Sequence, residues 1–463
     1  MRARLSACAQ PVFRALRQPF PIPNAPRVAR HLLTTASREL RILGIESSCD
    51  DTAAAVVDAR GQILGEAIRG QQQVHEPSGG IVPIEAVRKH VENMPFVVKE
   101  ALDRSGLGIA DVDAVAVTRG PGISSCLSVG LNAAKTLAAV ANKPLIGVHH
   151  MEAHALTARL CFPDQIHFPF LSLLISGGHT LLLIVHDVNR YTQLGTTRDD
   201  SVGDAFDKVA RALQLPWKSG RGGGAGAALE VAARHGDPAH LAYKLKVPMS
   251  INHQVSSLDF SFSGLKADVF RRVDQQLVSQ YGELTTNSDH PITDGAQPPP
   301  VFRYSGKPQP TFDPYRTLSK PLADTPTEED IPALAAGQLT PQFVFDMAAA
   351  FQTTAAQHLV QKIRLGFQHC RSIHGVTPRA LVASGGVASN QFIRDRLRCV
   401  ATEEFDTPLF CPPPHLCTDN GVMIAWAGLE RFRSGLVDDY GVQVLPKWPL
   451  ESLVKWPNFE SRY

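Results

Sequence analysis

From Leu40 onward the sequence carries one local pattern twice: two short apolar runs enclose a polar tip rich in Ser or Gly, and helical segments follow. Apolar runs this short, bounded by turn residues, favour paired β-strands. Strand pairs followed by helices indicate an α/β fold, and the repetition indicates two facing lobes that suit a nucleotide bound between them. The predicted strands and tips are Arg41–Ile45, Glu46–Thr52 and Ala53–Asp58, then Phe170–Ile175, Ser176–His179 and Thr180–His186.

The order of the remaining elements predicts the domain limits. A chain of 463 residues is long enough for two hydrophobic cores. We expect a first lobe at 39–168, closed by a helix at about 415–435, a second lobe at 169–414, and a tail at 436–463. The other predicted helices are Val91–Ser105, Ser124–Val140, His149–Leu160, Asp204–Leu213 and Val422–Arg431, and the other strands are Ala114–Thr118, Leu145–Val148 and Ala380–Ala383.

Two segments do not fit a packed lobe. The stretch 282–340 is rich in proline, including Pro298–Pro300, and shows no hydrophobic period. Such a segment buries too little apolar area to offset its ordering entropy, so we expect a disordered surface insertion. The segment 1–38 is rich in Arg, contains Ser and has no acidic residue before Glu39, which is typical of a mitochondrial import signal. A basic arm that contacts RNA is the alternative.

The composition narrows the class of partner. The formal net charge is only +2, so any contact with nucleic acid must come from a local basic patch. The longest apolar runs are of strand length, and no membrane span is expected. None of the 8 Cys forms a CxxC pair, which argues against a zinc finger, and Cys49 is expected to be a packing residue rather than a nucleophile.

A histidine pair opens one predicted helix. His150 and His154 are four residues apart, so both imidazoles lie on one helical face and can share a metal ion. A zinc protease of the HExxH type needs its Glu one residue after the first His, whereas Glu152 is two residues on and points away from that face. The protease interpretation therefore fails. A third ligand must come from elsewhere, and Asp419, near the start of a predicted helix, is either that ligand or a helix N-cap.

Small-residue turns at four places predict phosphate binding. Glycine turns beside strand ends let backbone N–H groups approach phosphate oxygens, and a following helix N-terminus adds a favourable dipole. Neither a P-loop nor a dinucleotide fingerprint is present. Asp204 and Asp207 lie on one face of the next helix, where one carboxylate either holds a ribose hydroxyl or belongs to a solvated first turn. The turns are Glu46–Thr52, Ser176–Thr180, Gly220–Gly226 and Ser384–Asn390.

Taken in order, these motifs resemble the TsaD family of tRNA N6-adenosine threonylcarbamoyltransferases, once labelled glycoprotease-like. The resemblance covers Leu40 to about Gly428 apart from the proline-rich insertion. The matching stretches are Ile42–Asp50, Gly79–Pro83, Gly120–Gly122, His149–His154, Ser176–His179, Asp207, Asp259–Lys266, Ser384–Asn390 and Thr418–Gly421.

This resemblance implies a two-lobed fold of the actin, sugar-kinase and Hsp70 class. It also implies one divalent metal, zinc or iron, held by His150, His154 and Asp419. The implied reaction is transfer of the threonylcarbamoyl group from threonylcarbamoyl-AMP to N6 of the adenosine on the 3′ side of the anticodon, in mitochondrial tRNAs reading ANN codons. The implied adenylate pocket consists of Ser176, Gly177, Gly178, His179, Thr180, Asp207, Gly226, Glu230 and Asn390.

Several expectations follow from the resemblance and the leader together. We expect a mitochondrial matrix enzyme that acts on tRNA as a homodimer, with no larger obligate complex and no membrane contact. Asp50 is the candidate for orienting or deprotonating the adenosine amine. The chain departs from the family pattern at Asp51, where many members have Glu, and at Gly220–Gly226, which is longer and lacks a proline. Counting forward from Asp207 selects Gly220, and counting back from Glu230 selects Gly226, which we favour.

Two other functions fit parts of the sequence. A small-molecule kinase or ATPase of the same fold class would share the phosphate turns but would not need the histidine pair. An RNA-binding scaffold would explain arginine-rich surfaces but would leave the polar loops without a role. The transferase accounts for both sets of features.

Overall fold

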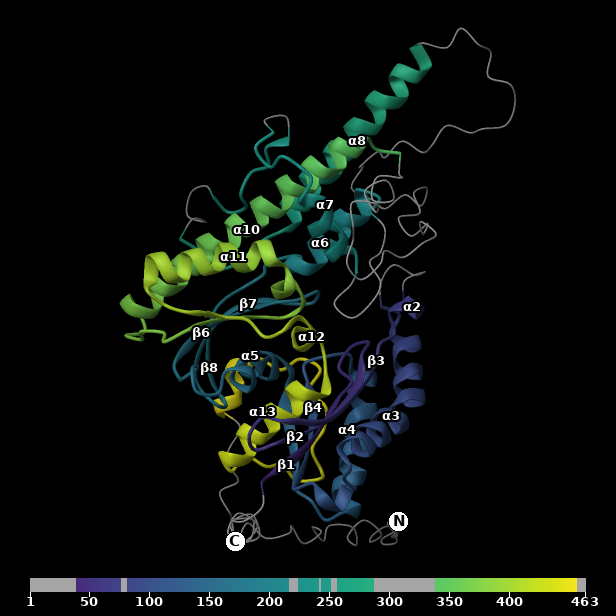
Figure 1. The fold of residues 1–463 in the computed structure, drawn as a ribbon, viewed down its shortest axis with the longest axis vertical. Helices are drawn as coiled ribbons and strands as arrows, with labels where there is room; N and C mark the ends of the chain where they lie inside the picture. Colours follow the sequence, from purple (N-terminus) through teal and green to yellow (C-terminus); the bar gives the residue numbers. More distant parts are fainter. Residues whose placement is uncertain are drawn as a thin grey trace, which may run out of the picture.

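The protein was analysed as a computed structural model, which describes residues 39–75, 81–215, 224–240, 243–250, 256–286 and 338–455. The expected leader 1–38 lies outside the described residues, as do 287–337 within the proline-rich stretch and Gly220. The chain forms two layered lobes, one above the other in Figure 1. No helix in the described ranges is long and apolar enough to cross a bilayer.

The first lobe is built on a five-stranded mixed sheet in the order β3-β2-β1-β4-β5. β1 (Arg41–Glu46) pairs antiparallel with β2 (Thr52–Asp58), which pairs antiparallel with β3 (Ile63–Arg69). On its other side β1 pairs parallel with β4 (Ala114–Gly120), and β4 pairs parallel with β5 (Leu145–His149). Because β1, β4 and β5 run parallel, their carboxyl ends, and the residues that follow, share one edge of the sheet.

The second lobe repeats this topology in its own five-stranded sheet, β10-β9-β6-β7-β8. β6 (Phe170–Ile175), β7 (Thr180–Asp187) and β8 (Arg190–Thr196) form the antiparallel meander. β9 (Leu381–Ser384) and β10 (Leu409–Phe410) extend it in parallel. The same strand order in both sheets confirms the predicted duplicated two-lobed fold of the actin, sugar-kinase and Hsp70 class.

Helices cover both sheets. In the first lobe these are α2 (Gln72–His75), α3 (Pro83–Ser105), α4 (Ser124–Val140) and α5 (His150–Cys161). In the second they are α6 (Val202–Ala212), α7 (Ala225–Ala233), α8 (Ser263–Thr286), α10 (Pro341–Ser372) and α11 (Gln391–Cys399). The short α12 (Pro414–Cys417) leads to α13 (Gly421–Arg433), which returns to the first lobe.

The return of α13 decides where Asp419 lies. A Cβ on Gly44 in β1 would stand 2.2 Å from the backbone nitrogen of Ala425, so only glycine lets α13 pack directly on that strand. The side chains of α13 from Val422 to Phe432 are buried. This packing brings the loop before α13 to the carboxyl end of β1, beside the start of α5 (Figure 1).

The predicted elements are confirmed, most of them to within a few residues. The short elements β10 and α2 and the helices α7 and α8 were not predicted, and three further differences have a physical reason. Strands β3 and β8 were not predicted, because both mix exposed polar positions with few buried ones. α3 begins at Pro83 rather than Val91, since proline at the first helical turn starts a helix well and its missing N–H costs nothing there. α10 was also not predicted, and it supplies one wall of the second lobe's core. The domain limits themselves stay a prediction.

Candidate active site

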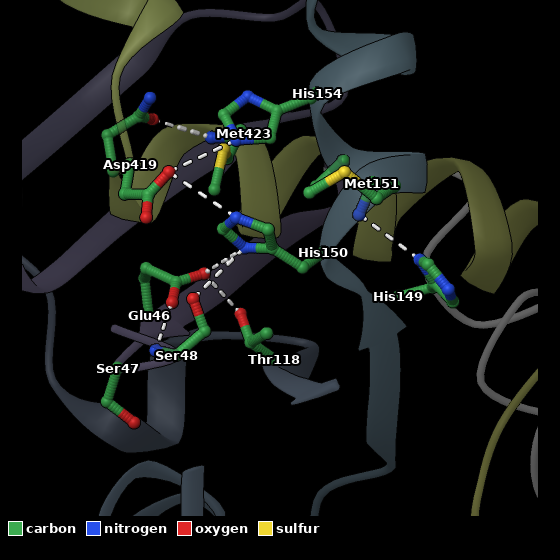
Figure 2. A network of polar contacts seen from close by, with 12 residues as sticks. Glu46, Ser47, Ser48, Thr118, His149, His150, Met151, His154, Asp419 and Met423 are labelled. Carbon is green, nitrogen blue, oxygen red and sulfur yellow. Dashed lines mark hydrogen bonds and ion pairs between the residues drawn. The ribbon is translucent and has the colours of Figure 1, made fainter. Parts of the chain in front are cut away.

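The two histidines of the predicted pair meet the predicted aspartate. β5 ends at His149, whose ring caps α5 by accepting a hydrogen bond from the backbone of Met151 (3.1 Å). His150 and His154 therefore occupy the first and second turns of α5, on one face. Their Nε2 atoms lie 3.4 Å and 3.1 Å from the same carboxylate oxygen, Oδ1 of Asp419 (Figure 2).

Asp419 is not the N-cap that the sequence left open as an alternative. The N-cap of α13 is Asn420, whose side-chain oxygen accepts a hydrogen bond from the backbone of Met423 at 2.8 Å. Asp419 therefore does not cap α13, and its carboxylate points toward the two histidines of α5 instead.

The donor set fits a divalent metal ion. A tetrahedral ion with bonds of about 2.1 Å holds its ligand atoms about 3.4 Å apart. The two nitrogen-to-oxygen separations, 3.4 Å and 3.1 Å, are close to this value, and the three candidate ligand atoms all lie within 4.8 Å of one another. Two imidazoles and a carboxylate form a set that accepts zinc or ferrous iron. His150, His154 and Asp419 are therefore able to hold one such ion.

Glu46 contacts His150 on the side away from Asp419, whereas the sequence analysis predicted it only as the first residue of a phosphate-binding turn. Its Oε2 accepts hydrogen bonds from Thr118 (2.5 Å) and from Nδ1 of His150 (3.2 Å), and its Oε1 from the backbone of Ser48 (Figure 2). A carboxylate on the far nitrogen of a ligand histidine fixes its ring and tautomer, leaving Nε2 free to bind. The only sequence signal is an acid at the end of an apolar strand, fully buried in the structure.

The two carboxylates beside His150 favour positive charge at this position. Burial alone would lower the pKa of His150, but the carboxylates of Asp419 and Glu46 raise it to about 10. Burial would likewise raise the pKa of Asp419, whereas His150 and His154 hold that pKa well below its usual range. Glu46 is fully buried and the Asp419 side chain is only 24% exposed, and carboxylates withdrawn from water in this way favour compensating positive charge.

Glu152 points to the opposite side of α5, as its position two residues after His150 predicts. Its Oε1 accepts from the Tyr191 hydroxyl (3.0 Å) and from the backbone of Asn189 (2.9 Å), and its Oε2 from Arg431 (2.9 Å). This carboxylate is fully occupied away from the metal ligands. A HExxH-type protease is therefore excluded by contacts as well as by spacing.

Asp50 lies in the β1–β2 tip, near the predicted metal ligand Asp419. Burial, followed by the negative charge of Asp419, raises its pKa above the usual range. Burial and the same two carboxylates raise the pKa of Cys49 so far that its thiol stays protonated. Cys49 is therefore a poor nucleophile, in line with the packing role expected for it.

In the second lobe, the turn between β6 and β7 forms the predicted small-residue tip. The backbone N–H of Ser176 donates to the carbonyl of His179 (2.8 Å), and the backbone N–H of His179 donates to the Ser176 hydroxyl (3.0 Å). Gly177 and Gly178 are exposed, and no atom lies within 4 Å of a Cβ placed on either. Thr180 is buried, and its hydroxyl accepts from the backbone N–H of Val202 at the start of α6 (2.9 Å).

A second turn, at Ser384–Asn390, closes on the first. Gly385 has φ of +97°, and a Cβ there would stand 2.4 Å from the carbonyl oxygen of Ile175. Only glycine permits this approach, so the turns after β6 and β9 pack edge to edge. Two glycine turns and the N-terminus of α6 thus share one edge of the second sheet.

The remaining predicted adenylate residues line up along α6, α7 and α11. Oδ1 of Asp207 accepts from the backbone N–H of Gly226 (2.8 Å), which places Gly226 beside Asp207 as favoured. Burial raises the pKa of Asp207. One turn further on α7, Glu230 accepts from the backbone N–H of Gln391 (3.0 Å). Asn390 caps α11 at Ile393 (3.0 Å) and donates to Gln352 (2.8 Å), so in this structure it acts as a helix cap.

His179 connects the two sets of residues. Burial, followed by the charges of His150 and His154, lowers the pKa of His179 to about 4. This ring of the second lobe therefore lies within electrostatic reach of the first lobe's metal ligands and is neutral at physiological pH. The structure brings the predicted metal residues and the predicted adenylate turn to the same place between the lobes.

Comparison with known proteins decides the family. The family model described as TsaD, tRNA N6-adenosine threonylcarbamoyltransferase, matches residues 62–426. The chain belongs to the TsaD family. It is accordingly an enzyme, a transferase that modifies tRNA.

Relatives in several kingdoms support this membership. The mitochondrial tRNA N6-adenosine threonylcarbamoyltransferase of Xenopus tropicalis is 42% identical, over 85% of this chain and 83% of its own length. The mitochondrial enzyme of Homo sapiens is 40% identical, over 88% and 86%. The enzyme of the bacterium Paramagnetospirillum magneticum is 40% identical, over 89% and 97%. The TsaD resemblance read from the motifs is therefore confirmed.

Proposed function

We propose that this TsaD-family chain transfers the threonylcarbamoyl group from threonylcarbamoyl-AMP to N6 of the adenosine 3′ of the anticodon, in mitochondrial tRNAs that read ANN codons. The observation that carries the proposal is the packing of α5, which bears His150 and His154, against the strand residues Leu174 and Leu181 that flank the β6–β7 turn. A donor whose phosphate rests on the turn would present its acyl group to the metal residues. The proposed adenylate pocket comprises the turn Ser176–Thr180, Asp207, Gly226, Glu230 and the Asn390 turn.

The proposed reaction is an acyl transfer with a phosphate leaving group. The lone pair of the adenosine N6 attacks the carbamoyl carbon, the bond from that carbon to the phosphate oxygen breaks, and AMP departs. The proton released from N6 passes to a base of the protein. An exocyclic amine is a weak nucleophile, so the chain's main contribution is to orient it and to exclude water.

The residues take distinct parts in this reaction. His150, His154 and Asp419 would hold the metal ion, which when bound supplies Lewis-acid stabilisation of developing negative charge. The backbone N–H groups of the exposed Gly177 and Gly178 would bind the donor's phosphate. Zinc or ferrous iron is the proposed ion, since a His2Asp site suits both.

Asp50 is the proposed base, because it lies in the β1–β2 tip near Asp419, and burial and that negative charge raise its pKa, which makes its carboxylate a stronger proton acceptor. Asp50→Ala is expected to lower kcat by about a hundredfold, the usual contribution of a positioned base. The dissociation constant of the donor, measured by calorimetry with a non-reacting analogue, should change by less than about threefold, because the donor's phosphate is proposed to rest on the β6–β7 turn. Asp51→Ala serves as the neighbouring control. Equal losses in kcat and in donor affinity would reject the role of base.

The function is tested by transfer in vitro. The purified chain without residues 1–38, threonylcarbamoyl-AMP and an unmodified tRNA with an ANN-reading anticodon are combined, and nucleosides are analysed by mass spectrometry. We expect N6-threonylcarbamoyladenosine and one AMP for each modified nucleoside. Release of AMP without modified tRNA would instead favour the kinase or ATPase alternative. That alternative does not account for the three converging metal ligands.

We also propose a homodimer in the mitochondrial matrix, without a larger obligate complex. The location rests on the arginine-rich leader and on the mitochondrial names of the human, Xenopus and Arabidopsis relatives. For the dimer, α3 exposes Ile84 (71%) and Val91 (60%), which are seven residues apart and form one apolar stripe. Light scattering is expected to give twice the chain mass, and Ile84→Glu/Val91→Glu should give the monomer mass. A native monomer would reject the dimer.

A further inference from the structure

The second lobe contains a cavity of about 570 Å³ that is lined by an excess of basic side chains. We call it the basic cavity. Its charged lining consists of five cations against two carboxylates, in a chain whose whole formal net charge is only +2. The charged residues are Arg198, Lys244, Lys246, Arg271, Arg272, Asp199 and Asp268.

The protein itself already engages both carboxylates of the cavity. Asp199 accepts hydrogen bonds from the hydroxyls of Ser261 (2.6 Å) and Ser263 (2.7 Å) and from the backbone of Phe262 (2.8 Å). Asp268 pairs with Arg271 (3.3 Å) and with Arg272 (3.5 Å). Neither carboxylate is therefore available to neutralise the remaining lysines.

Lys244 and Lys246 are the cations that remain available. Both are exposed, and among the described residues neither has a carboxylate within ion-pair distance. Arg198, by contrast, is paired with Asp259 at 3.0 Å. Two exposed ammonium groups that no described carboxylate pairs with, on the lining of a concave and positively charged surface, form a site for an anion.

Another part of the cavity lining, which includes Ser261, Gly264 and Leu265, is held in place by buried contacts. Phe260 and Phe262 are fully buried, and their rings stack on each other. Nε2 of His358 on α10 accepts from the backbone N–H of Ser261 (3.3 Å), and Lys362 on α10 donates to the carbonyl of Ser257 (2.7 Å). The motif Asp259–Lys266 thus sits on α10 in a fixed conformation. A preformed wall lowers the entropy cost of binding.

A single loop, residues 197–201, lies between the basic cavity and the β6–β7 turn where the donor's phosphate is proposed to bind (the donor turn). In the loop 197–201, Ser201 donates from its hydroxyl to the carbonyl of Gly177, and the next residue, Val202, bonds to Thr180. Asp199, two residues before Ser201, accepts hydrogen bonds from the hydroxyls of Ser261 and Ser263 in the cavity lining. One face of this loop therefore contacts the turn where the donor is proposed to bind, and the other face borders the cavity.

We propose that the basic cavity binds backbone phosphates of the RNA substrate while its adenosine reaches the donor turn. The inference rests on the proposed function, which puts a tRNA and the donor in the site together. A polyanion whose reactive base lies at the turn must carry phosphates over the neighbouring surface, and the cavity is the basic surface one loop away. Lys244 and Lys246 bind phosphate as point charges and give affinity without sequence preference.

The test compares two charge-reversed variants of the full chain. Lys244→Glu/Lys246→Glu reverses the cavity lysines. Arg60→Glu/Lys143→Glu makes the same change in charge at the far end of the first lobe, in turns opposite the carboxyl ends of β1 and β5. The dissociation constant of an unmodified tRNA transcript is measured by fluorescence anisotropy at several salt concentrations. Turnover is measured over a range of tRNA concentrations.

The cavity variant is expected to bind tRNA at least about tenfold more weakly and to show a smaller slope of log K against log salt, lower by about one or two. Its KM for tRNA should rise while kcat at saturating tRNA stays near the native value. The control variant should match the native protein within about twofold. Lys244→Gln/Lys246→Gln, which keeps polar side chains, should show a smaller loss in the same direction.

Unchanged tRNA affinity and salt slope in the cavity variant would overturn the proposal. Binding of free phosphate alone would also overturn it. That result would be seen if inorganic phosphate protects Lys244 and Lys246 from chemical acetylation while the tRNA does not. Failure of the proposed function is seen separately, as a native chain that binds tRNA but forms no modified adenosine.

Discussion

Replacing His150 and His154 together with alanine is expected to remove the bound metal and to lower the turnover of tRNA modification by about a thousandfold. The reason is geometric, because both Nε2 atoms converge on Asp419 at the separations that a tetrahedral ion requires. Loss of both imidazoles leaves one carboxylate, which holds a divalent ion weakly. A Lewis acid that stabilises the transition state by several kcal/mol corresponds to a rate factor of about this size.

The measurement has two parts, so that metal loss and activity loss are seen independently. Metal content of the purified variant is determined by elemental mass spectrometry, and modification is followed by nucleoside mass spectrometry. The control is His186→Ala/His374→Ala, which removes two imidazoles from the second lobe away from the site; His186 bonds only to Thr192 among the described residues (2.9 Å). Full turnover in a metal-free His150→Ala/His154→Ala protein would show that the reaction does not use this centre.

The sequence predicts those features of the site that depend on local spacing. The i, i+4 histidines share a face because α5 is an ordinary helix, and Glu152 points away for the same reason. The turn Ser176–His179 follows from two apolar strands around a polar tip. These relations hold within a few residues of chain, where backbone geometry alone fixes which side chains meet.

Features that depend on tertiary packing were not predicted. Glu46 lies 104 residues from His150 in sequence, and no local pattern connects them. Residue spacing alone left Asp419 open between ligand and N-cap, and only the family resemblance implied the ligand; the packing of α13 on β1 at Gly44, with Asn420 as the cap, supplies the physical reason. The edge strands β3 and β8 lack a continuous apolar signal because one side of each is partly exposed. Sequence patterns therefore identify the candidates, and the lobe packing selects among them.

Replacing Glu152 with alanine is expected to destabilise the protein by about 3–5 kcal/mol, the range for removing one partner of a buried ion pair. Glu152 and Arg431 belong to helices of the first lobe, α5 and α13, and are almost fully buried. The same carboxylate accepts from Tyr191 and from the backbone of Asn189, both in the β7–β8 region of the second lobe. The substitution would therefore leave a buried guanidinium without its counter-charge and would remove two hydrogen bonds that join the lobes.

A double-mutant cycle separates this electrostatic penalty from the loss of packing. Glu152→Ala/Arg431→Ala removes both charges, so its free energy of unfolding should be lower than native by clearly less than the sum of the two single losses. Unfolding is followed by circular dichroism in urea. The exposed pair Lys99–Asp103 on α3 is the control, and its double alanine variant should change stability by less than about 1 kcal/mol. Additive single effects at Glu152 and Arg431 would mean that their pairing does not couple the helices. A double-mutant loss far smaller than the sum of the single losses would show that the pair is strongly coupled. The pair, together with the hydrogen bonds from Tyr191 and Asn189, would then be what holds α5 and its two histidines against the second lobe.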